Sequence, residues 1–313
     1  MPDIVVMFFV LGAIAGLVRS DLTIPKAAYD VLSLLLMLTI GLKGGMALNG
    51  SLSWQLVQEL GGAVALGIAI PLLVYPAVRY LVRLSVADAA SLAAHYGSVS
   101  AGTFAVALAY VEANSLTVGG QVTLYLVMME LPAILIGLFL FRRLSRGSAE
   151  GSSQGLWHET LTNRSVILLV GGVIIGWMYG PNAGVSVTGL FTGAFQGVLA
   201  LFLLEMGLVA SQTLSGLKRD HIRLVLFALI APSVLSILGL GMALWLALPA
   251  GSAVILIALA ASSSYIAAPV AIRSAIPSAN IGLAMLASLG LTFPFNVIVG
   301  IPLYHSVWQW AAG

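Results

Sequence analysis

Two short runs rich in glycine, serine and threonine interrupt long apolar stretches of the sequence. The first is Gly97-Ser98-Val99-Ser100-Ala101-Gly102-Thr103, and the second is Ser262-Ser263-Ser264-Tyr265-Ile266-Ala267-Ala268-Pro269. Their hydroxyl groups both donate and accept hydrogen bonds, which suits a small oxyanion that carries an O–H group. Ser264 follows Ser98 by 166 positions (264 − 98 = 166), as Pro269 follows Thr103. Interrupted spans at matching places in two halves of a chain indicate the binding site of a secondary transporter.

Each run should end one half-helix and begin another. The glycines and serines of the first run lower its helix propensity, and Pro269 suits the first turn of a new helix. We therefore expect the second half-helices to begin near Thr103 and near Pro269. Their N-termini carry unpaired N–H groups and a partial positive charge, which attract an anion. The predicted substrate-binding residues are Gly97, Ser98, Ser100, Gly102, Thr103, Ser262, Ser263, Ser264 and Pro269. Close helix packing by small residues is the alternative interpretation.

A few ionisable side chains lie inside apolar stretches, where they are costly and are functional candidates by default. Glu130, directly before Leu131-Pro132, is the candidate for coordinating a coupling sodium ion or for carrying a proton, and an ion pair with Lys43 is the structural alternative. His95 is a second candidate proton carrier, against the alternative of a hydrogen-bonded packing residue. Ser264 and Tyr265 are further candidates for cation coupling. Asn296, in the last apolar stretch, is expected to satisfy backbone groups.

The composition requires lipid as the solvent for most of the chain. The sequence is 60% hydrophobic and 8% charged, with a mean hydropathy of +1.08, more apolar surface than a soluble core could hide. The basic residues are spread over separate short loops, which excludes a nucleic-acid-binding patch. The absence of cysteine excludes disulfides and thiol chemistry. The first apolar stretch, Ile4–Val18, is interpreted as a retained span and not as a signal peptide.

Apolar stretches of about 20 residues, the length that crosses a bilayer, divide the chain into ten predicted spans. They are 3–19, 27–48, 56–83, 87–112, 117–141, 163–180, 188–213, 221–248, 252–276 and 279–306. The polar stretch Arg142–Asn163 predicts a cytoplasmic linker. The predicted domains are a first repeat over 1–141, the linker over 142–163 and a second repeat over 164–313.

The 166-residue offset extends beyond the two interruptions. It aligns Gly41-Leu42 with Gly207-Leu208 and Ala113-Asn114 with Ala279-Asn280. Five spans in each unit would make the repeat inverted. Every lysine and arginine except Lys43 lies in or beside a loop that follows an odd-numbered span, which predicts that those loops are cytoplasmic and that both termini are outside. The predicted fold is all-α, with ten transmembrane helices in a 5+5 inverted repeat and broken helices 4 and 9.

Several motifs resemble the sodium-dependent bicarbonate transporter family, best known from cyanobacterial carbon concentration. They are Ile40–Ala47, Gly97–Thr103, Glu130-Leu131-Pro132-Ala133, Ala261–Ser264 and Arg273–Asn280, within a resemblance that runs from Leu22 to Tyr304. The resemblance implies bicarbonate import with sodium as the coupling ion, no organic cofactor, a homotrimer and a bacterial inner membrane. It also implies a core domain around the broken helices that slides against a gate domain of spans 1–2 and 6–7. The family's bicarbonate site falls here on Gly97, Ser98, Ser100, Thr103, Ser262, Ser263 and Ser264.

The sequence departs from the family pattern at the site itself. Tyr265-Ile266-Ala267-Ala268-Pro269 stands where the family has Asp-Ile-Ser-Gly-Pro, so an acidic residue and a serine are replaced. Glu130 stands where the family has Asp, and Ala101-Gly102 where it has Gly-Ser. Cyanobacterial members have a longer middle loop and a small cytoplasmic regulatory partner, and the short Arg142–Asn163 loop argues against that partner.

The leading functional hypothesis is sodium-dependent import of a small anion, bicarbonate by resemblance. The alternative is symport or exchange of another small carboxylate or oxyanion, including a proton-coupled form through Glu130 or His95. A non-transporting membrane sensor is a weaker alternative because the chain has no appended signalling domain. An intramembrane serine hydrolase is rejected because nothing pairs a serine with His95 and other catalytic groups are few.

Overall fold

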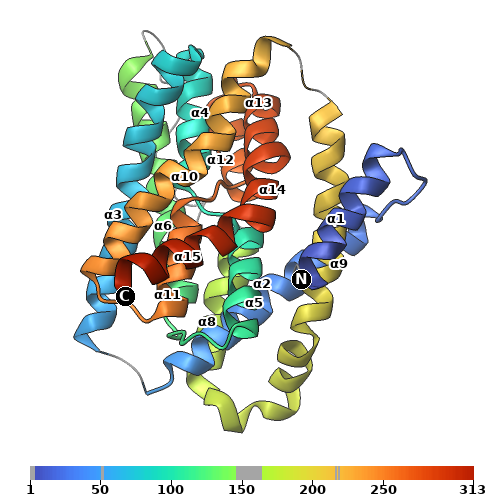
Figure 1. Cartoon of the computed structure of the whole chain (residues 1–313). Helices are drawn as coiled ribbons and strands as arrows, with labels where there is room; N and C mark the ends of the chain where they lie inside the picture. The colour runs from blue at the N-terminus through green and yellow to red at the C-terminus, as the bar shows by residue number, and fades with distance from the viewer. Residues whose placement is uncertain (1–3, 51–52, 146–163, 216, 218) are drawn as a thin grey trace.

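The computed structural model describes all residues except 1–3, 51–52, 146–163, 216 and 218, and every regular element in that part of the chain is helical (Figure 1). In chain order the elements are α1 (Ile4–Leu17), α2 (Lys26–Leu48), α3 (Trp54–Pro76), η1 (Ala77–Val82), α4 (Val86–Gly97), α5 (Ala101–Ala113), α6 (Val122–Leu144), α8 (Arg164–Ala183), α9 (Val185–Ser215), η2 (Arg219–His221), α10 (Ile222–Trp245), α11 (Ala250–Ala260), α12 (Ala267–Ala275), α13 (Ile281–Met285), η3 (Leu286–Thr292), α14 (Phe293–Phe295), η4 (Asn296–Gly300) and α15 (Ile301–Ala312).

Seven of the helical segments in the described residues are long and apolar enough to cross a membrane. Three shorter apolar helices, Ile4–Leu17, Ile167–Ala183 and Ala250–Ala260, overlap the stretches predicted as spans 1, 6 and 9. Length and composition therefore support a polytopic membrane protein, while the ten spans and the two repeat units stay predictions. Of the predicted linker, α6 covers the beginning through Leu144, and residues 146–163 lie outside the described part.

Two helix pairs, α1 with α9 and α2 with α8, pack against each other almost backbone to backbone. A Cβ on Gly41 of α2 would collide with the carbonyl oxygen of Leu169 in α8, and a Cβ on Gly207 of α9 would collide with that of Phe9 in α1. Small residues allow this close approach in membranes. Gly41 and Gly207 are the residues that the 166-residue offset aligns. Together α1, α2, α8 and α9 form one group of helices, with α1 and α9 at the right of Figure 1.

The remaining helices form a second group that encloses both interruptions. In this group α3 packs on α4 and α6, α10 packs on α11 and η3, and α11 packs on α5. The segment Val86–Ala113 contains the first interruption, and 94% of its most apolar 18-residue stretch is buried in protein. Irregular backbone at membrane depth is tolerated only in such surroundings, so the second group is what makes the interruptions possible.

Gly207 allows a test of the close packing between α1 and α9. We expect Gly207→Ala to destabilise the protein by about 1–3 kcal/mol, the cost of overpacking, because the new methyl group meets backbone atoms of Phe9, Gly12 and Ala13. Gly197→Ala, in the same helix, is the matched control, since a Cβ there has no neighbour within 4 Å. Thermal unfolding of the purified variants in detergent measures both. Equal melting temperatures would contradict the packing described here.

Candidate functional site

The first interruption lies between α4 and α5 and is three residues long. Helix α4 ends at Gly97, and both Ser98 (φ −77°, ψ 147°) and Ser100 (φ −97°, ψ 115°) have extended backbone. The Ser100 hydroxyl accepts a hydrogen bond from the Thr103 N–H at 3.0 Å and so caps α5. The new helix therefore begins at Ala101, two residues before the predicted start near Thr103.

The second interruption is longer and lies between α11 and α12. Helix α11 ends at Ala260 and α12 begins at Ala267, again two residues before the predicted start. The Ser264 hydroxyl accepts a hydrogen bond from the Ala268 N–H at 3.2 Å, in the first turn of α12. Pro269 lies in that same turn, where its missing N–H has no helical partner to lose.

The two interrupted segments cross and hydrogen-bond to each other. The Ser264 N–H donates to the carbonyl oxygen of His95 at 2.7 Å and to that of Ser98 at 3.2 Å. The Ser100 N–H donates to the hydroxyl of Ser262 at 3.0 Å, and that hydroxyl donates to the Leu259 carbonyl at 2.8 Å. Backbone groups freed by one interruption are thus satisfied by the other.

Buried polar atoms that lack a hydrogen-bond partner belong to the two interrupted segments and to the helices next to them. Among the described residues they are Ser91 Oγ, His95 Nε2, Ser98 Oγ, Thr103 Oγ1, Glu130 Oε1 and Tyr265 Oη. The Tyr265 hydroxyl lies beside Ser100, but its geometry makes no hydrogen bond. An unsatisfied buried polar group costs about 1–3 kcal/mol. Such a concentration at one place is the expected signature of a site that binds a polar ligand.

A small cavity lies at the crossing and brings four of the predicted residues together. Ser100, Glu130, Ser264 and Tyr265 line it. Ala101 and Ala267, the first residues of α5 and α12, line it as well, so both half-helix N-termini face the same space. The cavity measures about 20 Å³, which is room for one water-sized species. In this conformation it matches a monatomic cation better than a four-atom anion.

Other predicted residues support the crossing without lining the cavity. Ser262 holds Ser100, as described above, and the Ser263 hydroxyl is directed to that of Ser288 at 2.7 Å. Asn296 donates from Nδ2 to the Ala261 carbonyl oxygen at 2.9 Å, which confirms its expected role with backbone groups. Sequence reasoning missed Ser288, because neither its spacing nor the 166-residue offset connects it to the serine triplet.

The two glycines of the first interruption have different neighbours. A Cβ on Gly97 would meet the ring of Pro71 and, at 2.9 Å, Ala133, so this glycine permits close packing on α3 and α6. A Cβ on Gly102 would overlap the Tyr265 hydroxyl. Gly102 therefore provides the space that the tyrosine occupies, a relation that only the fold reveals.

His95 is fully buried on the last turn of α4. Its Nδ1 lies 2.7 Å from the Ser91 carbonyl oxygen, and because a carbonyl only accepts, Nδ1 carries the proton. This is the hydrogen-bonded packing residue of the alternative interpretation, with Nε2 directed away from the bond and without a partner. A role in proton transfer stays a prediction.

The proposed ion pair between Lys43 and Glu130 is wrong. Lys43 Nζ lies 2.6 Å from Glu112 Oε1 and 4.5 Å from the centroid of the Phe195 ring. Glu112 is close to the end of α5, and Glu130 is in the middle of α6. Within the described residues Glu130 has no ion pair, and its carboxylate is available to the cavity.

Aromatic side chains cover the crossing on the side of α1 and α9. The ring of Phe293 makes edge contacts with Tyr265, at 5.2 Å between centroids, and with Phe9 of α1, at 5.5 Å. Phe202 of α9 is also close, since a Cβ on Gly102 would lie 3.3 Å from its ring. These contacts connect the second group of helices to α1 and α9 beside the site.

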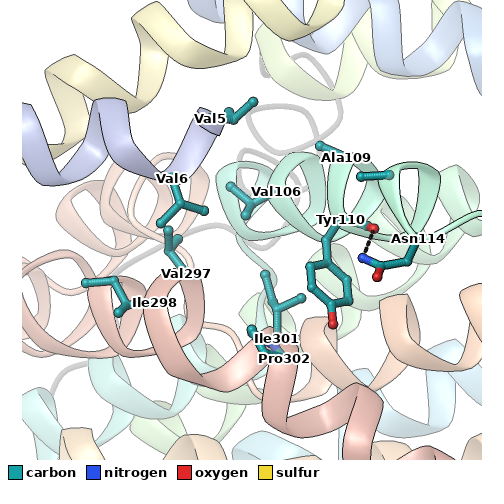
Figure 2. A pocket seen from close by; sticks show the side chains of 11 residues that line it. Val5, Val6, Val106, Ala109, Tyr110, Asn114, Val297, Ile298, Ile301 and Pro302 are labelled. Atoms are coloured by element: carbon teal, nitrogen blue, oxygen red, sulfur yellow. Dashed lines mark hydrogen bonds between the residues drawn. The ribbon is translucent and has the colours of Figure 1, made fainter. Parts of the chain in front are cut away.

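A second, larger cavity has a volume of about 490 Å³, and Figure 2 shows the side chains that line it. Its walls come from α1, α5, η4 and α15, including Val6, Val106 and Val297. Each of these residues is about one helical turn from a residue of the aromatic layer or of the crossing. Val6 is one turn from Phe9, Val106 from Gly102, and Val297 from Phe293. The larger cavity is therefore close to the aromatic layer along each of these three helical segments.

Comparison with known proteins identifies a family of transporters. The model of the Na+-dependent bicarbonate transporter superfamily matches residues 4–309, nearly the whole chain. Among curated proteins none matches the chain significantly. The family match confirms the resemblance drawn from the sequence motifs. It also excludes an enzyme as the leading interpretation, because the superfamily is one of transporters.

Ser262 allows a test of the crossing. We expect Ser262→Ala to destabilise the protein by about 1–3 kcal/mol, because it leaves the buried N–H of Ser100 without an acceptor. Ser236→Ala is the control, since that hydroxyl donates only to the Ser233 carbonyl of its own helix. Thermal unfolding in detergent measures both variants. If Ser262→Ala melted with the control, the hydrogen bond between the two interruptions would contribute nothing.

Proposed function

This chain belongs to the Na+-dependent bicarbonate transporter superfamily, and we propose that it imports bicarbonate with sodium across the bacterial inner membrane. The observation that carries the proposal is the crossing of the two interrupted helices. Two half-helix N-termini and several buried oxygen atoms without partners converge there. The hydroxyls of Ser98 and Thr103 are free to donate to the anion, and the O–H of bicarbonate requires an acceptor, which serine hydroxyls also provide.

Membership of a Na+-dependent family implies sodium as the coupling ion, and Glu130 is its proposed ligand. Hard cations prefer oxygen ligands. The small cavity offers the Glu130 carboxylate with the hydroxyls of Ser100, Ser264 and Tyr265. A cation there would stand next to the anion and offset its charge. Moving either ion alone through the membrane would cost more free energy than moving the pair. This difference is the physical basis of the proposed coupling.

The proposed movement is a sliding of the second group of helices, as a core domain, against the group α1, α2, α8 and α9, as a gate domain. The larger cavity lies between α1 and the core helices α5 and α15, and we propose it as the entry path from outside. Lys43 on α2 and Glu112 on α5 form an ion pair between the two groups. Sliding would exchange this pair and the Phe9–Phe293 contact for others.

A second candidate function is transport of another small carboxylate or oxyanion. It is favoured by Tyr265, which contributes a neutral hydroxyl to the cavity where family members have a carboxylate. Removing a negative charge there favours an anion of higher charge. Competition of unlabelled anions against labelled bicarbonate separates the two candidates. A sensor, in contrast, would show no uptake driven by a gradient.

Bicarbonate uptake tests the function and its site together. We expect labelled bicarbonate to enter proteoliposomes only with an inward sodium gradient, and Ser98→Ala to weaken apparent affinity about 10–100-fold, the loss of one or two hydrogen bonds to a charged ligand. Ser98→Ala leaves no protein group unsatisfied, because its hydroxyl has no partner. Ser264→Ala removes in addition a cap of α12 and should lose at least as much. Ser236→Ala is the control with unchanged uptake.

The outcomes of this experiment differ in meaning. Unchanged affinity in both serine variants would remove the anion from the crossing while leaving the transport function intact. Absence of bicarbonate uptake under any gradient, with uptake of another anion, would favour the second candidate.

The inverted repeat predicts which positions face opposite sides of the membrane. Ala113 and Ala279 are aligned by the 166-residue offset, so we expect Ala113→Cys to react with an impermeant thiol reagent from outside and Ala279→Cys only from inside. The chain has no cysteine of its own, so labelling has no background. Labelling of intact and of permeabilised cells measures this. Reaction of both positions from one side would contradict the inverted arrangement.

A further inference from the structure

A long apolar groove runs between α10 on one side and α3 with η1 on the other. Helix α3 is at the left of Figure 1. The groove has a volume of about 620 Å³, and Arg223 is the one charged residue in its lining. Exposed aliphatic side chains on its walls are Leu73, Leu81, Leu226, Ile230, Val234 and Ile237. The groove lies away from the crossing and from the larger cavity, and neither the anion nor the cation proposed above has a use for it.

One wall of the groove includes a change of helix type. Helix α3 ends at Pro76 and continues as a π-helix, Ala77–Val82, whose wider turns alter the path of the chain. Two small residues, Ala77 and Ala231, line the groove. Helical elements therefore line the groove on both sides.

The length of the groove corresponds to one lipid chain. From Arg223 to Leu238 the wall of α10 rises by 15 residues (238 − 223 = 15), or about 22 Å at 1.5 Å per residue. The hydrocarbon core of a bilayer is about 30 Å thick. The groove therefore begins at one membrane surface and extends past the middle, which accommodates an acyl chain from a single leaflet.

The charges are at one end of the groove only. Arg223 is exposed in the first turn of α10, and Arg83 is exposed directly after η1. Arg79 donates to the Leu84 carbonyl oxygen at 2.7 Å and is half-buried. Within the described residues Arg223 makes no ion pair. Basic groups at the surface end of an apolar groove between membrane helices suit an anionic headgroup.

We propose that this groove is a binding site for an anionic phospholipid, with an acyl chain along α10 and the headgroup phosphate at Arg223. The site also has a route to the crossing. Phe227 lines the groove, and its ring makes an edge contact with Tyr96 at 5.0 Å between centroids. Tyr96 precedes Gly97 and hydrogen-bonds to Thr292 Oγ1 at 2.7 Å. A lipid against Phe227 therefore supports the residue that holds the first interruption in place.

Native mass spectrometry of the purified protein tests the proposal directly, without any measurement of transport. The probes are phosphatidylglycerol and phosphatidylcholine with the same acyl chains. We expect the wild type to retain one more phosphatidylglycerol per chain than Arg223→Gln, and to show no such excess of phosphatidylcholine. Lys26→Gln makes the same change of charge at an exposed lysine outside the groove and should retain the lipid as the wild type does.

A second variant separates the contribution of the apolar groove to lipid binding from that of the Arg223 charge. Val234 is 54% exposed on the groove wall, so Val234→Trp should fill the space, keep Arg223 and still lose the extra phosphatidylglycerol. Melting temperatures with and without lipid accompany each sample, and phosphatidylglycerol should raise that of the wild type more than that of either groove variant. Equal retention of phosphatidylglycerol by all four proteins, or equal retention of the two lipids, would overturn the proposal. So would a change of oligomeric state in Val234→Trp, because a second copy of the chain would then cover the groove.

Discussion

Everything at the centre of this protein depends on satisfying the backbone of two unwound segments inside a membrane. In hydrocarbon an unpaired N–H or C=O costs several kcal/mol, so neither interruption could exist alone. They satisfy each other: the Ser264 N–H bonds to two carbonyl groups of the first segment, and the Ser100 N–H bonds to Ser262. This exchange requires that the two broken helices cross at one point. The surrounding helices α3, α6 and α10 follow from the need to enclose that point.

The same arrangement creates the electrostatics of the site. Two helix N-termini, at Ala101 and Ala267, face one cavity, and each carries a partial positive charge. Like charges at close range repel, and an anion between them converts the repulsion into attraction. Glu130 lines the same cavity, and as a carboxylate it would offset the partial charges of the N-termini and attract the proposed sodium ion. In the proposed function, anion and cation would both interact with this set of charges, and their coupling would need no further group.

Local chemistry explains why the interruptions were predictable from the sequence. Glycine, serine and proline act on their own turn of backbone, so both helix restarts were placed within two residues. The hydrogen-bond partner of each serine was not predictable. Ser262 and Ser263 are adjacent residues of the same type, yet Ser262 bonds to Ser100 and Ser263 to Ser288. The partner of Lys43 was also missed, since Glu112 is 69 residues away and only the fold connects them. Short helices such as α1 and α11 leave the number of spans undecided by length alone.

The contacts within and between the two groups of helices differ in kind. Within the gate group, Gly41 and Gly207 allow backbones to meet directly, and such interlocked surfaces resist sliding. Between the groups stand an edge contact of Phe9 with Phe293 and the ion pair of Lys43 and Glu112, whose side chains are 24% and 37% exposed. The first is worth about 0.5–1.5 kcal/mol beyond its buried area, and the second about 1 kcal/mol or less. In the sliding movement proposed above, the Phe9–Phe293 contact and the Lys43–Glu112 pair are the contacts that would be exchanged, while the close contacts at Gly41 and Gly207 would stay within the gate group.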